Sequence, residues 1–564
     1  MAINSLSYSL PEDLEKAVKA TFDDWQKENK ISRIWQKDPS VWTNDDEAKW
    51  LGWLDIVERE SQDLQKFRDF AEDAKRFKDI VLLGMGGSSL CPEVFSITFG
   101  ATNFHILDST VPAQIKTLES KIDLANTLFI VASKSGSTLE PNTFKQYFYQ
   151  RVSDTVGAET AGKQFVAITD PDSKMQQVAT RDNFRNIFYG DPEIGGRFSA
   201  LSVFGMIPAS AMDIDVEEFY NRTGEMIEAC KTENPVENPG AVLGTILGVC
   251  QTRGRDKLTI FTSKEIYDVG AWLEQLIAES TGKDDISIIP VDRETIGAPT
   301  EYGDDRIFAY LKLKDSTDDS LEDKINALEK NSQPVVRIEI VDAMNLGQEF
   351  FRWEFATAVA GSIMRINTFN QPDVESAKVE ARKLTEEYEH EGKLPDETPF
   401  YEEDGVKLFT DDKNADALNQ SLDGEKSLAN YLKAHFSRIG KNDYFALLAY
   451  IENNRENEDS LQKIRHQIFT EKQVATCLGF GPRFLHSTGQ AYKGGSNEGV
   501  FLQITSDDAT DLDVPEQKYT FGVVKAAQAR GDFQVLLDRE RRALRVHLGA
   551  DVKNGLEKLA NLIQ

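Results

Sequence analysis

Short, continuously apolar segments alternate with helical patterns along most of this chain. In the first half, such segments lie at residues 80–83, 104–107, 128–132, 165–168 and 186–188. Strands that are apolar at every position have both faces covered, which is typical of a parallel sheet with helices on each side. The pattern therefore predicts an α/β fold with a doubly wound parallel sheet.

The same alternation occurs twice more. Apolar segments at residues 257–261, 286–290, 308–311 and 335–340 predict a second doubly wound unit, and we expect the polar stretch at 315–333 to be a surface insertion. A third α/β unit is predicted from strands at residues 444–451 and 499–504 and a helix at 461–470.

These patterns divide the 564 residues into five parts, in keeping with the two or three domains expected at this length. The predicted parts are a helical segment at 1–75, a first α/β domain at 76–235, a second at 236–385, an acidic linker at 386–428 and a C-terminal α/β extension at 429–564.

The charge and cysteine content narrow the class of protein. The formal net charge of −30 argues against nucleic acid as a partner, so an anionic ligand would need a local positive site. The four cysteines are widely scattered, which predicts reduced thiols and no zinc site. No secretory signal pattern and no membrane-length apolar run is present, so we expect a cytoplasmic protein without membrane contact.

The segment Ser133-Lys134-Ser135-Gly136-Ser137-Thr138 directly follows an apolar strand pattern and precedes a helical one. A helix N-terminus offers unpaired N–H groups and the positive end of the helix dipole, and the hydroxyls add further donors. The segment therefore predicts an anion site suited to the single phosphate of a sugar phosphate. The alternative is an ordinary Ser/Thr-rich surface turn.

A glycine-rich turn at residues 83–89 follows the first predicted strand, and Asp108 comes about twenty residues later. This spacing imitates a dinucleotide-binding fingerprint, but Ser89 stands where the third glycine belongs. Because the hydroxyl segment lies at the end of a neighbouring strand, we expect a compact phosphosugar rather than a dinucleotide.

Two further segments carry candidate catalytic groups. Gly195 and Gly196 would let the backbone approach a ligand, with Arg197 as a fixed cation; the alternative is a surface arginine. Gln275 and Glu279 share one face of a helix near its C-terminal end. The helix dipole disfavours a carboxylate there, so we expect a raised Glu279 pKa, useful for a base; the alternative is a solvated glutamate.

Five motifs, in order across residues 75–385, resemble the glucose-6-phosphate isomerase family: LLGMGGSSLCP, ASKSGSTLEP, GGRFSALS, QLIAESTGK and INTFNQPDVESAK. The sequence beyond 430, with FLHSTGQAYKGG, is similar to the isomerase half of fused transaldolase–glucose-6-phosphate isomerase proteins. The resemblance implies two sugar-isomerase (SIS) domains, a homodimer, and interconversion of glucose 6-phosphate and fructose 6-phosphate through a cis-enediol without metal or cofactor.

The resemblance also implies a role for each motif residue. Gly87 and Ser88 would lie beside the sugar, and Gln275 beside the substrate. The other implied roles are phosphate binding by Ser133, Lys134 (through its backbone N–H), Ser135 and Thr138, enediolate stabilisation by Arg197, proton transfer by Glu279, and contact near the ring oxygen by Gln371 and Lys378.

One position departs from the family pattern. Arg306 stands where the family has the histidine that opens the sugar ring, and an arginine stays protonated at physiological pH. Either Lys378 does more of this work or a histidine arrives from elsewhere. Among the six histidines, His486 is the best replacement because it lies among small polar residues.

Two other functions remain compatible with these motifs. One is a non-catalytic SIS-type regulator that binds sugar phosphate; such a module needs the phosphate loop but no base, so Glu279, Arg197 and Lys378 together favour the enzyme. The other is an isomerase of the same fold that also accepts mannose 6-phosphate.

Overall fold

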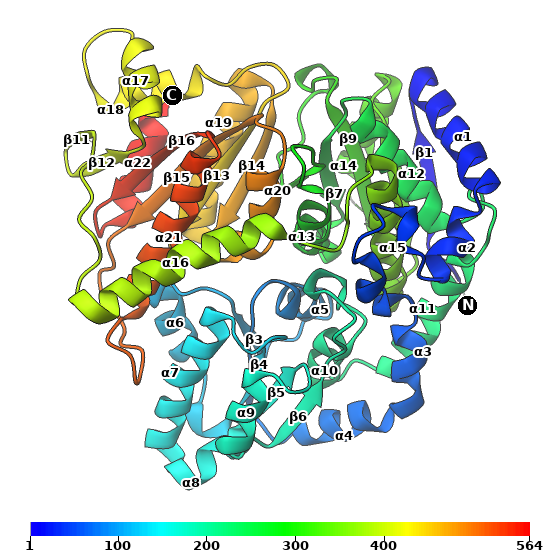
Figure 1. Ribbon diagram of the computed structural model, residues 1–564, viewed down its shortest axis with the longest axis horizontal. Coiled ribbons are helices and arrows are strands. Elements are labelled where there is room, and N and C mark those ends of the chain that lie inside the picture. The colour runs from blue at the N-terminus through cyan, green and yellow to red at the C-terminus, as the bar shows by residue number, and fades with distance from the viewer. Residues whose placement is uncertain (1, 318, 564) are drawn as a thin grey trace.

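The computed structural model describes residues 2–317 and 319–563, which form three β-sheets with helices packed around them. Figure 1 shows the first sheet at the bottom, the second at the upper right and the third at the upper left. The predicted fold class is confirmed: two doubly wound, mainly parallel sheets are followed by a C-terminal α/β unit. Residues 1 and 564, at the ends of two predicted parts, and 318, inside the predicted insertion, lie outside the described residues.

The first domain has a parallel sheet in the order β3-β2-β4-β5-β6. Its central strands β2 and β4 are buried at every position, as their apolar sequences require. The strands are β2 Asp79–Leu83, β3 Phe104–Leu107, β4 Thr127–Ala132, β5 Phe165–Thr169 and β6 Asn186–Tyr189; the helices are α5 Leu90–Thr98, α6 Pro112–Glu119, α7 Leu139–Val156, α8 Ala158–Ala161, α9 Lys174–Arg181, α10 Val203–Ala211 and α11 Val216–Cys230.

The second domain has the strand order β1-β10-β9-β7-β8 and is parallel except for the edge strand β1. Its elements are β7 Lys257–Thr262, β8 Ile289–Asp292, β9 Arg306–Leu313 and β10 Val335–Ile340, with helices α12 Pro239–Thr252, α13 Val269–Thr281, α14 Asp319–Lys330, α15 Leu346–Met364 and α16 Pro372–Glu391. The predicted surface insertion at 315–333 is largely α14, whose Ile325 and Leu328 are buried in a small apolar cluster.

The third domain has the strand order β11-β12-β16-β15-β13-β14, with a parallel core formed by β16, β15, β13 and β14. Its strands are β11 Tyr401–Glu403, β12 Val406–Phe409, β13 Tyr444–Tyr450, β14 Ala475–Phe480, β15 Gly499–Ser506 and β16 Arg542–Leu548; its helices are α17 Asp412–Gln420, α18 Leu428–Phe436, α19 Arg455–Lys472, α20 Gly489–Gly494, α21 Phe521–Asp538 and α22 Val552–Ile563.

Two predicted segments are corrected by the strand pairing. The segment 1–75 is not wholly helical: β1 (Ser5–Ser9) joins the second sheet, followed by α1 Glu12–Lys27, α2 Lys30–Trp35, α3 Ile56–Glu60 and α4 Gln65–Ala74. The predicted acidic linker at 386–428 contains the hairpin β11–β12, which pairs with β16. It is therefore part of the third domain, because its few apolar residues, Val406 and Leu408 among them, are buried in that domain's core.

Shared apolar clusters join the three domains. Ala278, Ile289 and Val291 of the second domain pack with Tyr444 and Leu448 of the third. On the first domain, a separate cluster joins helix α7 to α21 of the third domain, where the rings of Phe144 and Phe521 lie 6.2 Å apart. The third domain is thus fixed against both others. No helix in the described ranges is long and apolar enough to cross a membrane.

Candidate active site

Eleven of the twelve predicted site residues line one cavity of about 580 Å³, at the meeting point of the three domains. They are Gly87, Ser88, Ser133, Lys134, Ser135, Thr138, Gln275, Glu279, Gln371, Lys378 and His486. The exception is Arg197, which lies behind Glu279 and Gln371 and contacts both. Residues separated by up to four hundred positions therefore form a single site.

The hydroxyl segment lies between the end of β4 and the N-terminus of α7. Gly136 has a positive φ of 66°, and a Cβ there would lie 2.2 Å from the backbone nitrogen of Met175, so the turn requires glycine. Ser133 Oγ is buried and has no hydrogen-bond partner among the described residues. A free hydroxyl and a helix N-terminus at one cavity wall form a site suited to an anion.

The Lys134 side chain is already paired. Its Nζ lies 2.6 Å from Asp170 Oδ2 and donates to the backbone oxygen of Asp191 at 2.7 Å. Burial raises the pKa of Asp170, and the Lys134 ammonium opposes that rise. Any contact of Lys134 with a phosphate would therefore come from its backbone, as the resemblance implies.

Two glycine turns meet at the floor of the cavity. The 3-10 helix at Gly86–Ser88 follows β2, and a Cβ at Gly87 would lie 2.0 Å from the backbone oxygen of Gly196. Gly196 begins the short helix that carries Arg197. The absence of a side chain at Gly87 thus lets these two loops pack backbone to backbone and brings Arg197 to the site.

The Arg197 guanidinium is buried and fully engaged. It donates from Nε to Ser280 Oγ at 2.8 Å and from Nη1 to Gln371 Oε1 at 2.6 Å. Its Nη2 donates to the backbone oxygens of Thr368 and Asn370. Burial lowers the pKa of Arg197 to about 10, and Glu279 opposes this change. The group is thus a rigid cation at the back of the site.

Glu279 lies in the last turn of α13 and is 6% exposed. Its Oε2 lies 3.6 Å from Arg197 Nη1 and accepts a hydrogen bond from Gln275 Nε2 at 3.3 Å. The pKa of Glu279 is raised, in the expected direction, but the main cause is burial rather than the helix dipole, and Arg197 and His486 oppose it. The carboxylate can therefore accept a proton inside the cavity while still held next to a cation.

Lys378 lies at the mouth of the cavity on α16. Its Nζ is 2.8 Å from Glu375 Oε1, and its side chain is 34% exposed. Gln371 immediately precedes this helix.

Arg306, in contrast, is fully buried away from the cavity and pairs with Glu294, with Nη1 and Oε2 3.0 Å apart. Arg306 therefore lies at the contact with the third domain, where Glu294 also accepts a hydrogen bond from Thr476 Oγ1.

His486 enters the cavity from the third domain of the same chain, on the 3-10 helix Arg483–His486 that follows β14. Its Nε2 lies 2.9 Å from Glu140 Oε1, and Glu140 is in the first turn of α7. Glu140 Oε1 also accepts from Gln528 Nε2 at 2.7 Å, and Gln528 Oε1 accepts from Thr110. The pKa of Glu140 is lowered because the His486 charge and hydrogen bond outweigh burial.

Glu140, Gln528 and Thr110 were not among the predicted site residues. Glu140 is the only one with a signal in the sequence, since it stands inside the ASKSGSTLEP motif directly after the hydroxyl segment. Gln528 lies on α21 and Thr110 follows β3, and neither belongs to a motif. Their contact with the site depends on how the third domain packs on the first.

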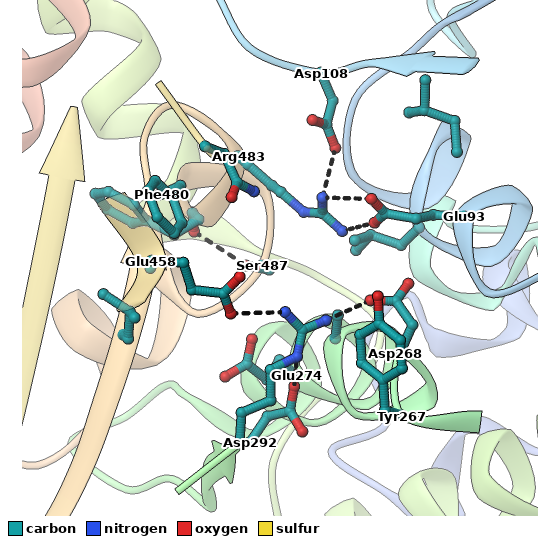
Figure 2. A pocket seen from close by; sticks show the side chains of 18 of the residues that line it. Glu93, Asp108, Tyr267, Asp268, Glu274, Asp292, Glu458, Phe480, Arg483 and Ser487 are labelled. Atoms are coloured by element: carbon teal, nitrogen blue, oxygen red, sulfur yellow. Dashed lines mark hydrogen bonds and ion pairs between the residues drawn. The ribbon is translucent and has the colours of Figure 1, made fainter. Parts of the chain in front are cut away.

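Charged residues hold the helix that carries His486. Figure 2 shows Arg483 reaching across a second cavity to Glu93 of α5 and to Asp108 at the end of β3. Arg483 Nη1 is 3.1 Å from Glu93 Oε1 and 3.4 Å from Asp108 Oδ2. Arg293, which lines the same cavity, joins Asp268 to Glu458. Both arginines link the third domain to its neighbours.

Helix α20 follows directly and packs against the end of α13. A Cβ at Gly282 would lie 2.2 Å from Ala491 Cα, so these backbones are in close contact. Gln490 Nε2 donates to the backbone oxygen of Gly282 at 2.7 Å, and its Oε1 accepts from the backbone nitrogens of Asp373 and Val374. One side chain thus joins the end of α13 to the start of α16.

Comparison with known proteins agrees with this geometry. A family model described as "Phosphoglucose isomerase" matches residues 60–306. A probable glucose-6-phosphate isomerase from Methanococcus maripaludis is 27% identical over 58% of this chain and 82% of its own length. The glucose-6-phosphate isomerase of Prochlorococcus marinus is 24% identical over 81% of this chain and 91% of its own.

Solved structures show the same fold. A hypothetical protein from Thermus thermophilus superposes with a TM-score of 0.58 at 22% identity, covering 67% of this chain and 99% of that one. A glucose-6-phosphate isomerase from Chlamydia trachomatis does so with a TM-score of 0.50 at 20% identity, covering 63% and 77%. The matched family model and the curated relatives support the glucose-6-phosphate isomerase family that the motifs indicate for this chain.

Proposed function

We propose that this protein is a glucose-6-phosphate isomerase that interconverts glucose 6-phosphate and fructose 6-phosphate through a cis-enediol. The observation that carries the proposal is the position of Glu279, a buried carboxylate with a raised pKa, in the same cavity as the hydroxyl segment. A buried base beside a phosphate site is what an aldose–ketose isomerase needs. A regulator that only binds sugar phosphate has no use for it.

In this proposal the phosphate binds at the N-terminus of α7, with Ser133, Ser135 and Thr138 donating hydroxyls and Lys134 its backbone N–H. The sugar then extends across Gly87 and Ser88 toward Glu279, with Gln275 and Gln371 at its sides. Glu279 removes the proton from C2 and returns it to C1. Arg197, 3.6 Å from Glu279, stabilises the negative charge that grows on the enediolate.

Ring opening is assigned to His486 with Lys378. Imidazole is the side-chain group that commonly transfers protons in enzymes, and the hydrogen bond between His486 Nε2 and Glu140 fixes the orientation of this ring. Lys378 supplies a cation at the open end of the same cavity. Arg306 takes no part, because its guanidinium is paired with Glu294 outside the cavity.

The test is a coupled assay of fructose 6-phosphate and glucose 6-phosphate turnover by the full chain, with and without a chelator. We expect turnover in both directions that the chelator does not change. Binding of either sugar phosphate without turnover would support the regulator instead.

A homodimer and a cytoplasmic location are further proposals drawn from the family. The molar mass measured by light scattering tests the first, and microscopy of a tagged chain tests the second.

A further inference from the structure

We propose that the third domain holds a second ligand site, separate from the isomerase cavity, that binds a small phosphate-bearing anion. The site is a cavity of about 360 Å³, a volume in the range of small-molecule sites. It is lined by residues of β12, β13, β15, β16 and α21 and by the segment that precedes β11. None of its residues lines the cavity that contains Glu279.

The topology of the sheet places this cavity where α/β folds bind ligands. β13 and β15 are neighbours in this sheet. The chain leaves β13 toward β14 on one side and leaves β15 toward β16 on the other. Because the two connections run in opposite directions, they leave a crevice at the carboxyl ends of β13 and β15. Tyr450 ends β13, and Thr505 and Ser506 end β15; all three line the cavity. The cavity therefore lies at the carboxyl edge of the third sheet, next to its switch point.

The charges in the cavity favour an anion, in a chain whose net charge is −30. Four cations line it, against three carboxylates: Lys407, Lys525, Arg530 and Arg545 face Glu397, Asp507 and Asp508. His547 adds a group that can become positive, although burial lowers its pKa. The cavity in Figure 2, by comparison, has more carboxylates than arginines. The lining of the second site thus has more cations than carboxylates, whereas the chain as a whole has a large negative charge.

Arg545 is the central group of this site. It is 3% exposed, and its guanidinium lies 4.4 Å from the centre of the Phe409 ring and 5.4 Å from that of Phe533. Its Nε is buried and has no hydrogen-bond partner in the described part of the chain. A buried guanidinium is costly unless acceptors bind it, so the Arg545 side chain is suited to an oxyanion ligand.

One carboxylate already shows what these arginines bind. Glu397 Oε1 accepts from Arg545 Nη2 at 2.6 Å, and Glu397 Oε2 lies 2.7 Å from Arg530 Nε. Lys525, also buried, reaches Asp508 Oδ1 at 2.7 Å and the backbone oxygen of Ser506 at 3.0 Å. The two arginines thus already hold one oxyanion group, the carboxylate of Glu397. A phosphate can accept hydrogen bonds from several arginine and lysine donors at once, and we therefore infer that the ligand carries a phosphate group.

The experiment is calorimetric titration of the full chain with inorganic phosphate and, separately, with glycerol 3-phosphate. We expect two classes of site in the wild-type protein. Arg545→Met should weaken one class about tenfold or more, because a charge-assisted hydrogen bond is lost. Thr138→Ala should weaken only the other class. Lys413→Met, which removes a cation from the surface of the same domain outside the cavity, is the matched control and should change neither.

The circular dichroism spectrum and the melting temperature of each Arg545 and Lys525 variant serve as the check on folding. If Arg545→Met unfolds, Lys525→Met and Arg545→Lys provide the same comparison. Tighter binding of glycerol 3-phosphate than of phosphate would identify a phosphate ester as the ligand, and the reverse would identify the free ion. Unchanged affinities in folded Arg545 and Lys525 variants, or equal weakening in Lys413→Met, would overturn the site. Because binding is measured directly, a failure of the proposed isomerase activity would not affect this result.

Discussion

At the scale of single residues, Glu279 and Glu274 make a natural pair for testing the proposed base. Both lie on α13, but Glu279 lines the isomerase cavity, whereas Glu274 lines the charged cavity of Figure 2. Glu279→Gln should lower kcat about a hundredfold or more with little change in KM, since shape is kept and basicity lost. Glu274→Gln is the control and should leave kcat nearly unchanged. Similar losses in both variants would show that α13 matters only structurally.

The raised pKa of Glu279 predicts the acid side of the pH profile. The carboxylate must be ionised to accept the C2 proton, so kcat/KM should fall as the pH falls through the Glu279 pKa. Because burial raises that pKa above its ordinary value of 4.5, the fall should begin at a higher pH than an exposed glutamate would give. A profile of kcat/KM against pH tests this, and an acid limb centred below 4.5 would contradict it.

His486 can be separated from Glu279 by the substrate used. His486→Ala should slow turnover of the cyclic sugar about tenfold or more, but should hardly affect proton exchange at C2 of an analogue that cannot close its ring. His466→Ala, at an exposed position on α19, is the matched histidine control. Equal losses on both substrates would assign ring opening to Lys378 alone.

At the scale of secondary-structure elements, the 3-10 helix Arg483–His486 depends on its charged contacts for its position. Arg483→Met removes the pairs with Glu93 and Asp108, so His486 should lose its alignment and kcat on the cyclic substrate should fall about tenfold. Arg293→Met removes a comparable pair in the same cavity but on another element. It should lower the melting temperature without this loss in kcat, and equal kcat values for the two variants would rule out the positioning role.

The elements also show what the sequence could predict. The parallel strands of the first two sheets follow from unbroken apolar runs such as β4, and the hydroxyl segment lies at a strand end as its pattern indicates. The strand β1 was missed because three of the five residues in its sequence, SLSYS, are serine, and because its partner β10 is distant in the sequence. The hairpin β11–β12 was hidden in an acidic stretch with few apolar residues.

The contacts of the site were predictable only where they lie within one motif. Gln275 and Glu279 are four residues apart on one helix, so their contact follows from helix geometry. His486 and Glu140 are 346 residues apart. Their hydrogen bond depends on how the third domain packs on the first, which no local pattern encodes, although His486 itself was selected by its polar surroundings.

At the scale of the whole molecule, every group assigned to the reaction comes from one chain. Mixing the Glu279→Gln and His486→Ala proteins, unfolded and refolded together, should therefore restore no activity, because any site that contains the intact His486 also contains the altered Glu279. Steady-state rates of the mixture against each variant alone provide the measurement. Recovery of a substantial fraction of wild-type activity would mean that His486 acts in a partner subunit.

The third domain thus has a consequence for mass action. In an active site shared between subunits, the active fraction falls when dilution separates them. Here the histidine is joined to the base by the polypeptide itself, so its effective concentration at the cavity does not depend on how much protein is present. The specific activity should accordingly stay constant across dilutions that would dissociate an assembly held by weak contacts.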